Sequence, residues 1–378
     1  LAVVAKDDGG AESTTNVTAE VTVSAVNDAP TLTAFAAVVD STSEDTEVEI
    51  TLADLKAQGN EADIDGTVDA FVVTSISTGT LNIGASSPGT AWVATTNDTI
   101  DATNKAYWTP ATDAAGTLDA FVVVAEDNNS EPSTTANVTA QVTVSNVNDP
   151  PTATPTTPVI TDEDTNKVFA EGEFGFADVD TADTLSKIQI TAIPGAGTLY
   201  VDADTDGIVD VGEAVAANDD VAVGDITSSK LKFKPVADAN GTTYASFDYK
   251  VHDATEYSTS AYTITIDVTA TNDAPVFVNL GDVSPTYTEG GLAIMLDTDA
   301  TVSDVELTLA DDFNGATLTL ENTLGANAED VFSAKVAGTL GTLTEGGNLT
   351  VGGSDIGTVT TNSNGTLLLT FDNTNATP

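Results

Sequence analysis

Apolar and polar residues alternate with a period of two along several segments of this chain. Between positions 137 and 144, valine or alanine fills every second position, and the same alternation runs over 17–23 and 262–268. This pattern is typical of strands that bury one face and expose the other, as in an antiparallel sheet. Helical periodicity is hard to find, so the pattern predicts an all-β chain.

A short marker follows each alternating segment. The markers are VNDAPT at Val26–Thr31, VNDPPT at Val147–Thr152 and TNDAPV at Thr271–Val276, so their asparagines are 121 and 124 residues apart. A period of that length corresponds to a whole domain and not to one turn of a solenoid. About seven short strands per period, separated by Gly, Asn and Asp, predict tandem β-sandwiches.

The markers divide the chain into four parts. Residues 1–28 are expected to form the last two strands of a preceding sandwich. Residues 29–149 and 150–273 are each expected to form a complete sandwich, and 274–378 a sandwich that stops before its last two strands. An Asp-x-Asp step recurs within the period, at 63 and 65 and again at 178 and 180.

One twelve-residue segment, DADTDGIVDVGE, interrupts the β pattern inside the part 150–273. Oxygen donors stand at its positions 1, 3, 5, 9 and 12 and glycine at position 6, which is the spacing of a calcium loop. The alternative is an acidic hairpin turn with accidental spacing. The expected calcium ligands are Asp202, Asp204, Asp206, Ile208 through its backbone carbonyl, Asp210 and Glu213.

The net charge of the chain is a second indication of bound cations. The chain has 59 acidic and 10 basic residues, for a formal net charge of −49. Self-repulsion on this scale destabilises a compact chain unless cations neutralise it. The same acidity argues against nucleic acid as a partner, because nucleic-acid binding needs a basic face.

Other features of the composition narrow the possible functions. Apolar residues make up 40% of the chain, enough for ordinary cores, and cysteine is absent. The absence of cysteine excludes disulfides, so bound metal is the obvious alternative stabiliser. A single histidine argues against a zinc site or a Ser-His-Asp triad, and we assign no catalytic residue. No stretch of eighteen apolar residues is present, so no membrane span is expected.

The linker Asn27-Asp28-Ala29-Pro30 resembles that of cadherin-like repeats, as found in giant bacterial surface adhesins of the calcium-dependent RTX type. Glu44, the Asp63 and Asp65 pair and the strand end Ala125-Glu126-Asp127 match the same pattern. The resemblance covers essentially the whole chain. It implies tandem Ig-like or cadherin-like antiparallel sandwiches in a linear rod, with Ca²⁺ bound at the seams.

Carried over residue by residue, the resemblance implies three seam sites. The first seam would use Asp28 with Asp63, Asp65 and Asp127. The second would use Glu44 and Asp149 with Asp178, Asp180 and Asp253. The third would use Glu163 and Asp273 with Asp304, to which Glu306 can be added. The alternative for the linker aspartates is turn chemistry, since Asn-Asp-x-Pro forms a good turn by itself.

These features indicate a non-enzymatic extracellular stalk or extender of a bacterial cell-surface adhesin, stiffened by calcium ions and contacting neighbouring repeats of a longer chain. One alternative is the subunit of a self-assembling filament, sheath or surface layer, in which one chain's first strands complete another chain's last sandwich head to tail. Another is a peptide- or sugar-binding tip. A carboxylate pair for glycoside hydrolysis lacks support, because aromatic residues are only 6% of the chain.

Overall fold

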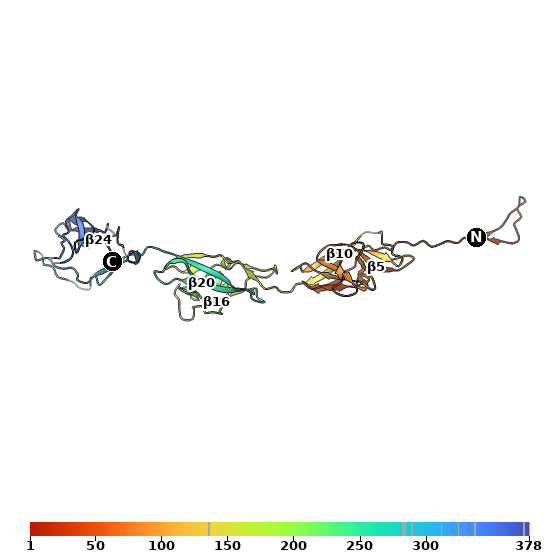
Figure 1. The fold of residues 1–378 in the computed structure, drawn as a ribbon, viewed down its shortest axis with the longest axis horizontal. Helices are drawn as coiled ribbons and strands as arrows, with labels where there is room; N and C mark the ends of the chain where they lie inside the picture. The colour runs from red at the N-terminus through yellow and green to blue at the C-terminus, as the bar shows by residue number, and fades with distance from the viewer. Residues whose placement is uncertain are drawn as a thin grey trace. The chain divides into compact units, whose positions relative to one another are not determined.

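The computed structural model describes residues 1–134, 137–281, 285–288, 290–310, 312–323, 325–335, 338–372 and 375–377. It divides into two compact units. The first comprises Leu1–Pro151 with Ala177–Thr184 and Asp253–Glu256, and the second comprises Thr152–Phe176, Leu185–His252 and Tyr257–Pro378. Strands dominate both units (Figure 1). The predicted fold class, all-β with tandem Ig-like or cadherin-like β-sandwiches, is confirmed.

The first sandwich packs two sheets against each other. In spatial order, the larger sheet contains β3 (Asp40–Ser43), β11 (Val138–Ser145), β10 (Gly116–Asp127), β5 (Val68–Ile76) and β8 (Thr99–Ile100). The smaller sheet contains β4 (Val48–Ile50), β9 (Lys105–Thr109), β6 (Thr80–Gly84) and β7 (Thr90–Ala91). β3 runs parallel to β11, whereas the other pairings of the larger sheet are antiparallel.

The alternation in the sequence sets the core of this sandwich. In β11, Val138, Ala140, Val142 and Val144 are buried and the residues between them are partly or fully exposed, as predicted. Trp108 of β9 is completely buried on the facing sheet, and its indole Nε1 donates to the carbonyl of Thr78 at 2.8 Å. A buried indole N–H needs such a partner, so this contact fixes the orientation of the ring.

A helix that the periodicity does not reveal, α1 (Leu52–Gln58), follows β4. Thr51 caps its first turn: its hydroxyl accepts from the amide of Asp54, and the Asp54 carboxylate accepts from the amide of Thr51 at 2.8 Å. Such a reciprocal capping box satisfies amides that an uncapped helix leaves without partners. The helix then buries Leu55 in the core of the first sandwich.

The second sandwich repeats this plan. In spatial order, its larger sheet contains β13 (Val159–Asp162), β21 (Tyr262–Thr269), β20 (Gly241–His252), β16 (Lys187–Ala192) and β18 (Asp220–Ala222). Its smaller sheet contains β14 (Lys167–Val168), β19 (Leu231–Lys234) and β17 (Thr198–Val201). β13 pairs parallel with β21. Shorter elements are β12 (Thr152–Ala153), β15 (Phe176–Ala177), the 3₁₀ helix η1 (Glu171–Phe174) and α2 (Val223–Thr227).

Aromatic side chains fill the core of the second sandwich. Phe169 meets Phe247 edge to face at 5.5 Å between ring centroids, and Phe174 meets Tyr249 in the same way at 5.1 Å. The buried hydroxyl of Tyr249 donates to the carbonyl of Phe174 at 2.7 Å. Edge-to-face contacts of this kind add stability beyond the area that they bury.

A glycine opens the strand that leads to the acidic loop of the second sandwich. Gly197 has a φ of +70°, and a Cβ there would lie 2.4 Å from Cζ of Phe233. The matching residue of the first sandwich, Gly79, has a φ of +68°, and a Cβ there would lie 2.2 Å from the carbonyl oxygen of Thr109, as one at Gly197 would lie 2.7 Å from that of Lys234. Only glycine fits both the left-handed backbone and the close approach. Both glycines begin a Gly-Thr-Leu sequence, at 79–81 and 197–199, and this recurrence therefore has a steric cause.

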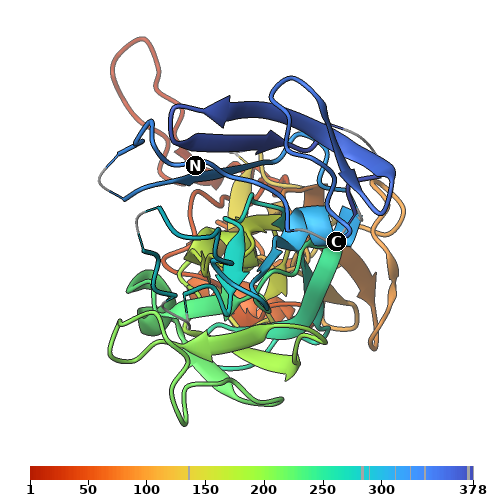
Figure 2. The ribbon, with the colours of Figure 1, turned by 90° about the vertical axis from the view of Figure 1, so that its left-hand side faces the viewer.

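The C-terminal sheet has the order β24 (Thr317–Glu321), β27 (Thr366–Thr370), β26 (Ser354–Ser363) and β25 (Asn348–Val351), drawn in blue in Figure 2. Its small core centres on Leu349, Val359 and Leu367. Upstream of this sheet, β22 (Val276–Val278) pairs with β23 (Thr301–Ser303), and α3 (Val305–Ala310) follows.

The first 28 residues depart from the expected strand pattern. Only β1 (Ala2–Val3) and β2 (Val17–Thr18) form, and they pair with each other. Val21 and Val23 are 72% and 85% exposed, so the prediction that 17–23 buries one face is wrong in this structure. A two-stranded pair has no second layer to cover its apolar face. None of the helices in the described part of the chain is long and apolar enough to cross a membrane.

Candidate metal centres

The acidic loop of the second sandwich connects two segments whose backbones are hydrogen-bonded to each other. The amide of Val201 donates to the carbonyl of Glu213 at 2.9 Å, and that of Val215 to the carbonyl of Leu199 at 2.9 Å. Gly207, at the sixth position of the loop, has a φ of +80° and makes the sharp turn that the sequence predicted. The loop therefore brings its two ends together as a calcium loop requires.

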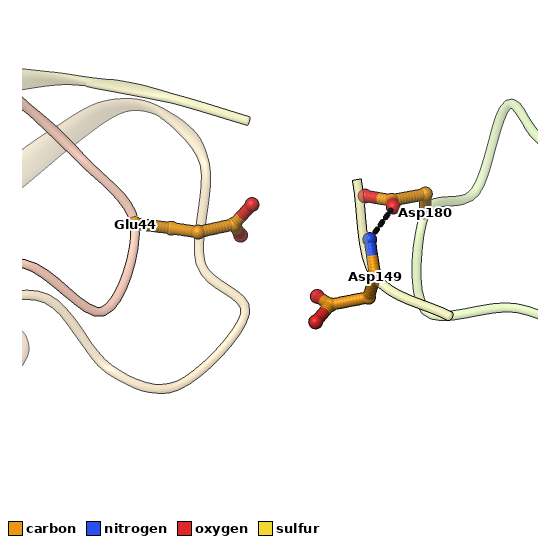
Figure 3. A group of neighbouring side chains, drawn as sticks. All are labelled: Glu44, Asp149 and Asp180. Atoms are coloured by element: carbon orange, nitrogen blue, oxygen red, sulfur yellow. Dashed lines mark hydrogen bonds between the residues drawn. The ribbon is translucent and has the colours of Figure 1, made fainter. Parts of the chain in front are cut away.

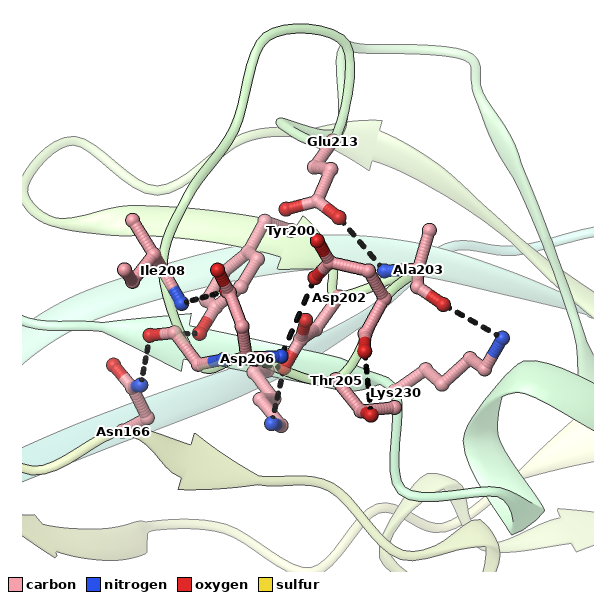
Figure 4. A network of polar contacts seen from close by, with 12 residues as sticks. Asn166, Tyr200, Asp202, Ala203, Thr205, Asp206, Ile208, Glu213 and Lys230 are labelled. Carbon is pink, nitrogen blue, oxygen red and sulfur yellow. Dashed lines mark hydrogen bonds and ion pairs between the residues drawn. The ribbon is translucent and has the colours of Figure 1, made fainter.

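Three of the predicted ligands converge inside this loop. One carboxylate oxygen from each of Asp202, Asp204 and Asp206 lies within 4.8 Å of the other two. Glu213 folds over the beginning of the loop, where Oε1 accepts from the amide of Ala203 at 2.8 Å (Figure 4). Its Oε2 accepts from the amide of Asp210 at 3.1 Å. Convergent oxygen donors without nitrogen or sulfur suit a hard cation such as Ca²⁺.

Asp202 shows most directly that the loop fits a cation. The residue has 0% exposure, and its Oδ2 accepts from the amide of Gly207 at 3.1 Å and from the ammonium of Lys232. The hydrogen bond from Lys232 lowers the pKa of this carboxyl, which therefore stays ionised. The other oxygen, Oδ1, is buried and has no hydrogen-bond partner among the described residues. A buried, ionised oxygen without a donor suits a metal ion.

Neighbouring side chains fix the backbone of the loop. The carbonyl of Gly207 accepts from Tyr200 Oη at 3.2 Å and from Asn166 Nδ2 at 2.8 Å. Burial, with the nearby Asp202 charge, raises the pKa of Tyr200 to about 12, so its hydroxyl stays protonated and donates. The amide of Ile208 donates to Asp206 at 2.7 Å, and the role of the Ile208 carbonyl as a ligand stays a prediction.

Like charges crowd the loop. The Asp206 carboxylate, followed by burial and Asp204, raises the pKa of Asp210. A raised pKa in an aspartate means that its ionised form is disfavoured where it stands. A bound cation would relieve that repulsion, so Asp210 stays a predicted ligand although its carboxylate is not in the converging group.

A second cluster gathers at the linker after β11. One carboxylate oxygen from each of Glu44, Asp149 and Asp180 lies within 4.8 Å of the others (Figure 3). The amide of Asp149 donates to Asp180 at 2.9 Å, and the amide of Val147 donates to Glu44. Glu44 and Asp180 are 5% and 7% exposed. These carboxylates come from a turn before β4, the linker and the loop 177–184.

Asp180 also belongs to a neighbouring triplet with Asp178 and Asp183. Asp178 Oδ2 is buried without a hydrogen-bond partner in the described part of the chain. Burial is the largest cause that raises the pKa of Asp178 and of Asp149, and nearby carboxylates add to it. The linker therefore places ionisable oxygens where negative charge is costly, which is a setting that a divalent cation stabilises.

A third cluster lies in the second unit around Asp273. It forms one triplet with Glu163 and Glu306 and another with Asp164 and Asp238. Asp273 Oδ2 is buried and lacks a hydrogen-bond partner among the residues that the structure describes. Burial, followed by the Glu306 charge, raises the pKa of Asp273.

Asp304 does not join this third cluster. Its Oδ1 accepts from the amide of Leu307 at 3.0 Å, in the first turn of α3. A carboxylate there satisfies an amide that the helix leaves without a partner. Glu306, two residues further on, reaches Asp273 instead, and its carboxylate accepts from the amide of Asp273 at 3.3 Å.

The residues predicted for the first seam are not brought together in the same way. No three carboxylate oxygens of Asp28, Asp63, Asp65 and Asp127 lie within 4.8 Å of one another, although all four residues are described. Asp28 and Asp65 do meet, since the amide of Asp28 donates to Asp65 at 3.3 Å. Asp63 accepts from the amides of Asp65 and Gly66 at 3.0 and 2.9 Å.

Asp127 and Asp253 hold the marker asparagines. Asp127 accepts from Asn27 Nδ2 at 2.6 Å, and Asp253 accepts from Asn148 Nδ2 at 3.1 Å. The other oxygen of each aspartate accepts from two amides of the turn that follows its strand. The hydrogen bond from Asn27 is the largest cause that lowers the pKa of Asp127. Both aspartates therefore anchor the linker to a strand end.

Three carboxylates of these clusters were not predicted from the sequence: Asp164, Asp183 and Asp238. Asp164 adjoins the predicted ligand Glu163, and Asp183 lies three residues after Asp180. Asp238 matches Asp113 in the first sandwich, and both have a positive φ, at 58° and 56°. A comparison of the two repeats at the turns that follow Trp108-Thr109-Pro110 and Phe233-Lys234-Pro235 would have identified Asp238.

Comparison with known proteins gives similarity to solved structures only. No family model matches the chain, and no curated protein matches it. It is similar to extracellular cadherin domains 1–4 of protocadherin gamma B7, with 12% identity and a TM-score of 0.35 over 92% of this chain and 69% of that one. It is also similar to domains 1–4 of Drosophila N-cadherin, with 14% identity and a TM-score of 0.24 over 93% and 68%.

The solved structures also include an enzyme. An endo-fucoidan hydrolase from glycoside hydrolase family 107 matches with 17% identity and a TM-score of 0.21. The match covers 71% of this chain, which spans only about a third of the hydrolase, at 33% of its length.

Proposed function

We propose that this chain is a non-enzymatic extracellular stalk or extender segment of a bacterial cell-surface adhesin, with Ca²⁺ as its structural cation. The convergence of Glu44, Asp149 and Asp180 at the linker carries the proposal. These carboxylates belong to a turn, the linker and a loop that are far apart in sequence. A cation held there would tie the three segments together.

The proposed mechanism is a change in linker stiffness. Without a cation, burial and nearby carboxylates raise the pKa of Asp149 and Asp178, so the ionised linker repels itself. With Ca²⁺ bound, the same oxygens would become ligands and the linker would lose its freedom to bend. The parts 29–149, 150–273 and 274–378 would then form successive rigid segments.

The expected energies are sufficient for such a change. Extracellular calcium modules bind with dissociation constants of about 10⁻⁴–10⁻³ M. At ten times the dissociation constant, each site adds about 1.4 kcal/mol to the folded state. Several sites together become comparable with the whole stability of one domain, which is about 5–15 kcal/mol.

Small-angle scattering tests this proposal. The chain should show a larger maximum dimension and a narrower distribution of shapes in millimolar calcium than in chelator. A control with Glu44→Gln, Asp149→Asn and Asp180→Asn keeps the side-chain sizes and removes the charges, so calcium should extend it less. Identical scattering of the unsubstituted chain in calcium and in chelator would contradict the proposal.

A second candidate function, self-association, is favoured by one observation. Val17, Val21 and Val23 are 69%, 72% and 85% exposed and occupy odd positions, which share one face in an extended strand. Such a segment can add to the open sheet edge of another copy. Light scattering after size exclusion should then show oligomers that Val21→Lys plus Val23→Lys abolishes. A strict monomer at high concentration would exclude this candidate.

A further inference from the structure

Two lysines contact the acidic loop of the second sandwich, and one of them, Lys232, pairs with a buried carboxylate. The Lys232 ammonium, on β19, pairs with Asp202 Oδ2, and the two side chains are only 15% and 0% exposed. Lys232 lies opposite Tyr200 in the pairing of β17 with β19, so the strand register places it beside the start of the loop. The pair is thus part of the sheet and not a chance contact of a mobile surface side chain.

The first sandwich has neither the acidic loop nor a lysine at the position equivalent to Lys232. In the first sandwich, Leu81 of β6 pairs with Trp108 of β9, and in the second, Leu199 of β17 pairs with Phe233 of β19. These two pairings align the strands of one sandwich with those of the other. In that register Tyr107 stands where Lys232 stands, and Gly84 stands where Asp202 stands. The first sandwich has a short turn after Gly84 in place of the acidic loop. Lysine and aspartate are therefore both present with the loop and both absent without it.

Burial makes the pair important to folding. An ionised carboxylate with no exposure is costly unless a counter-charge and hydrogen bonds compensate it. Lys232 supplies the counter-charge at Oδ2, and the amide of Gly207 supplies a hydrogen bond at 3.1 Å. Oδ1 meanwhile stays without a partner among the described residues, so one oxygen is left for a metal ion.

We propose that Lys232 is the resident counter-ion of the loop, which keeps the second sandwich folded without metal and weakens its affinity for calcium. This inference rests on the proposed calcium site for its second half only. The ammonium offsets one of the negative charges that face the ion, so the attraction for a divalent cation is smaller than the carboxylates alone would give. The loop then binds calcium reversibly, because the ion-free state is already neutralised at its most buried carboxylate.

The test compares Lys232→Met with Lys230→Met. Lys230 is a matched control, because its ammonium donates to the carbonyl of Ala203 in the same loop at 3.2 Å and pairs with no carboxylate of that loop in the described structure. In chelator, Lys232→Met should lower the melting temperature of the second sandwich by about 5–10 °C. In calcium titrations it should bind about tenfold more tightly. Lys230→Met should change both quantities little.

Two further variants keep the test decisive if Lys232→Met does not fold. Lys232→Arg retains the charge and should behave like the natural chain in both measurements. The pair Asp202→Asn plus Lys232→Met removes both charges and should restore the melting temperature in chelator while it abolishes calcium binding by the loop.

Each half of the inference can fail separately. An unchanged melting temperature of Lys232→Met in chelator would overturn the counter-ion role, whatever calcium does. Calcium affinity of Lys232→Met equal to or weaker than that of the natural chain would overturn the affinity role. A natural loop that binds no calcium at millimolar concentration contradicts the proposed function instead, and the chelator measurement still decides the role of Lys232.

Discussion

Replacement of Asp206 and Glu213 together by alanine is expected to abolish the calcium-dependent stabilisation of the second sandwich. Asp206 is one of three converging carboxylates, and Glu213 folds over the start of the loop. At a hundred times the dissociation constant, a lost site costs about 2.7 kcal/mol of calcium-dependent stability. Calorimetric melting with calcium and with chelator measures the difference.

The control removes the same number of acidic residues elsewhere in the same sandwich. Glu171 of η1 and Asp225 of α2 belong to none of the carboxylate clusters in the described structure. Glu171→Ala plus Asp225→Ala should leave the calcium-dependent increase in melting temperature intact. An equal increase in the loop variant and in this control would show that the loop is not a calcium site.

Trp108→Ala is expected to destabilise the first sandwich by about 3–5 kcal/mol. Trp108 is completely buried between the two sheets, and its indole holds the carbonyl of Thr78. The truncation leaves a large cavity and removes the partner of that carbonyl. Denaturant unfolding, followed by calorimetry to separate the transitions, should show the loss in the first sandwich only.

Trp92 provides the comparison for that substitution. It is only partly buried, and its Nε1 donates to the carbonyl of Val73 at 3.2 Å. Trp92→Ala should therefore cost clearly less than Trp108→Ala. A matching loss in the second sandwich on Trp108→Ala would show that the two sandwiches do not unfold independently.

The sequence predicted the parts of the fold that depend on local period. The alternation in β11 and the glycine before β17 are directly visible in the residues, because side-chain direction and backbone sterics act over neighbouring positions. In the segment 17–23 no second layer is present, so the same alternation did not lead to burial. The helix α1 was not predicted, because its 7 residues bury only Leu55 and so show no helical period of apolar positions.

The candidate sites were predictable to the extent that the repeat fixes them. Asp202 was predicted from the spacing of the calcium-loop motif, whereas Asp180 and Glu163 were implied by the resemblance to cadherin-like repeats. The contacts of Asp127 and Asp253 with the marker asparagines were not predictable from the sequence. Only the folded turn shows that their oxygens already accept hydrogen bonds from amides and from these asparagines. Lys232 could not be found from spacing, because its contact with Asp202 depends on the register between two strands 30 residues apart.

The parallel pairing of β3 with β11, and of β13 with β21, has a mechanical consequence. In each sandwich, the two paired strands are the first and the last strand of the larger sheet along the chain. When the chain is pulled at both ends, the first strand is therefore pulled toward its N-terminus and the last strand toward its C-terminus. Because the two strands are parallel, these forces act in opposite directions along their shared hydrogen bonds. The hydrogen bonds between the two strands then share the shear force and must break together, not one after another. Each sandwich is thereby built to bear a pulling force along its own strands.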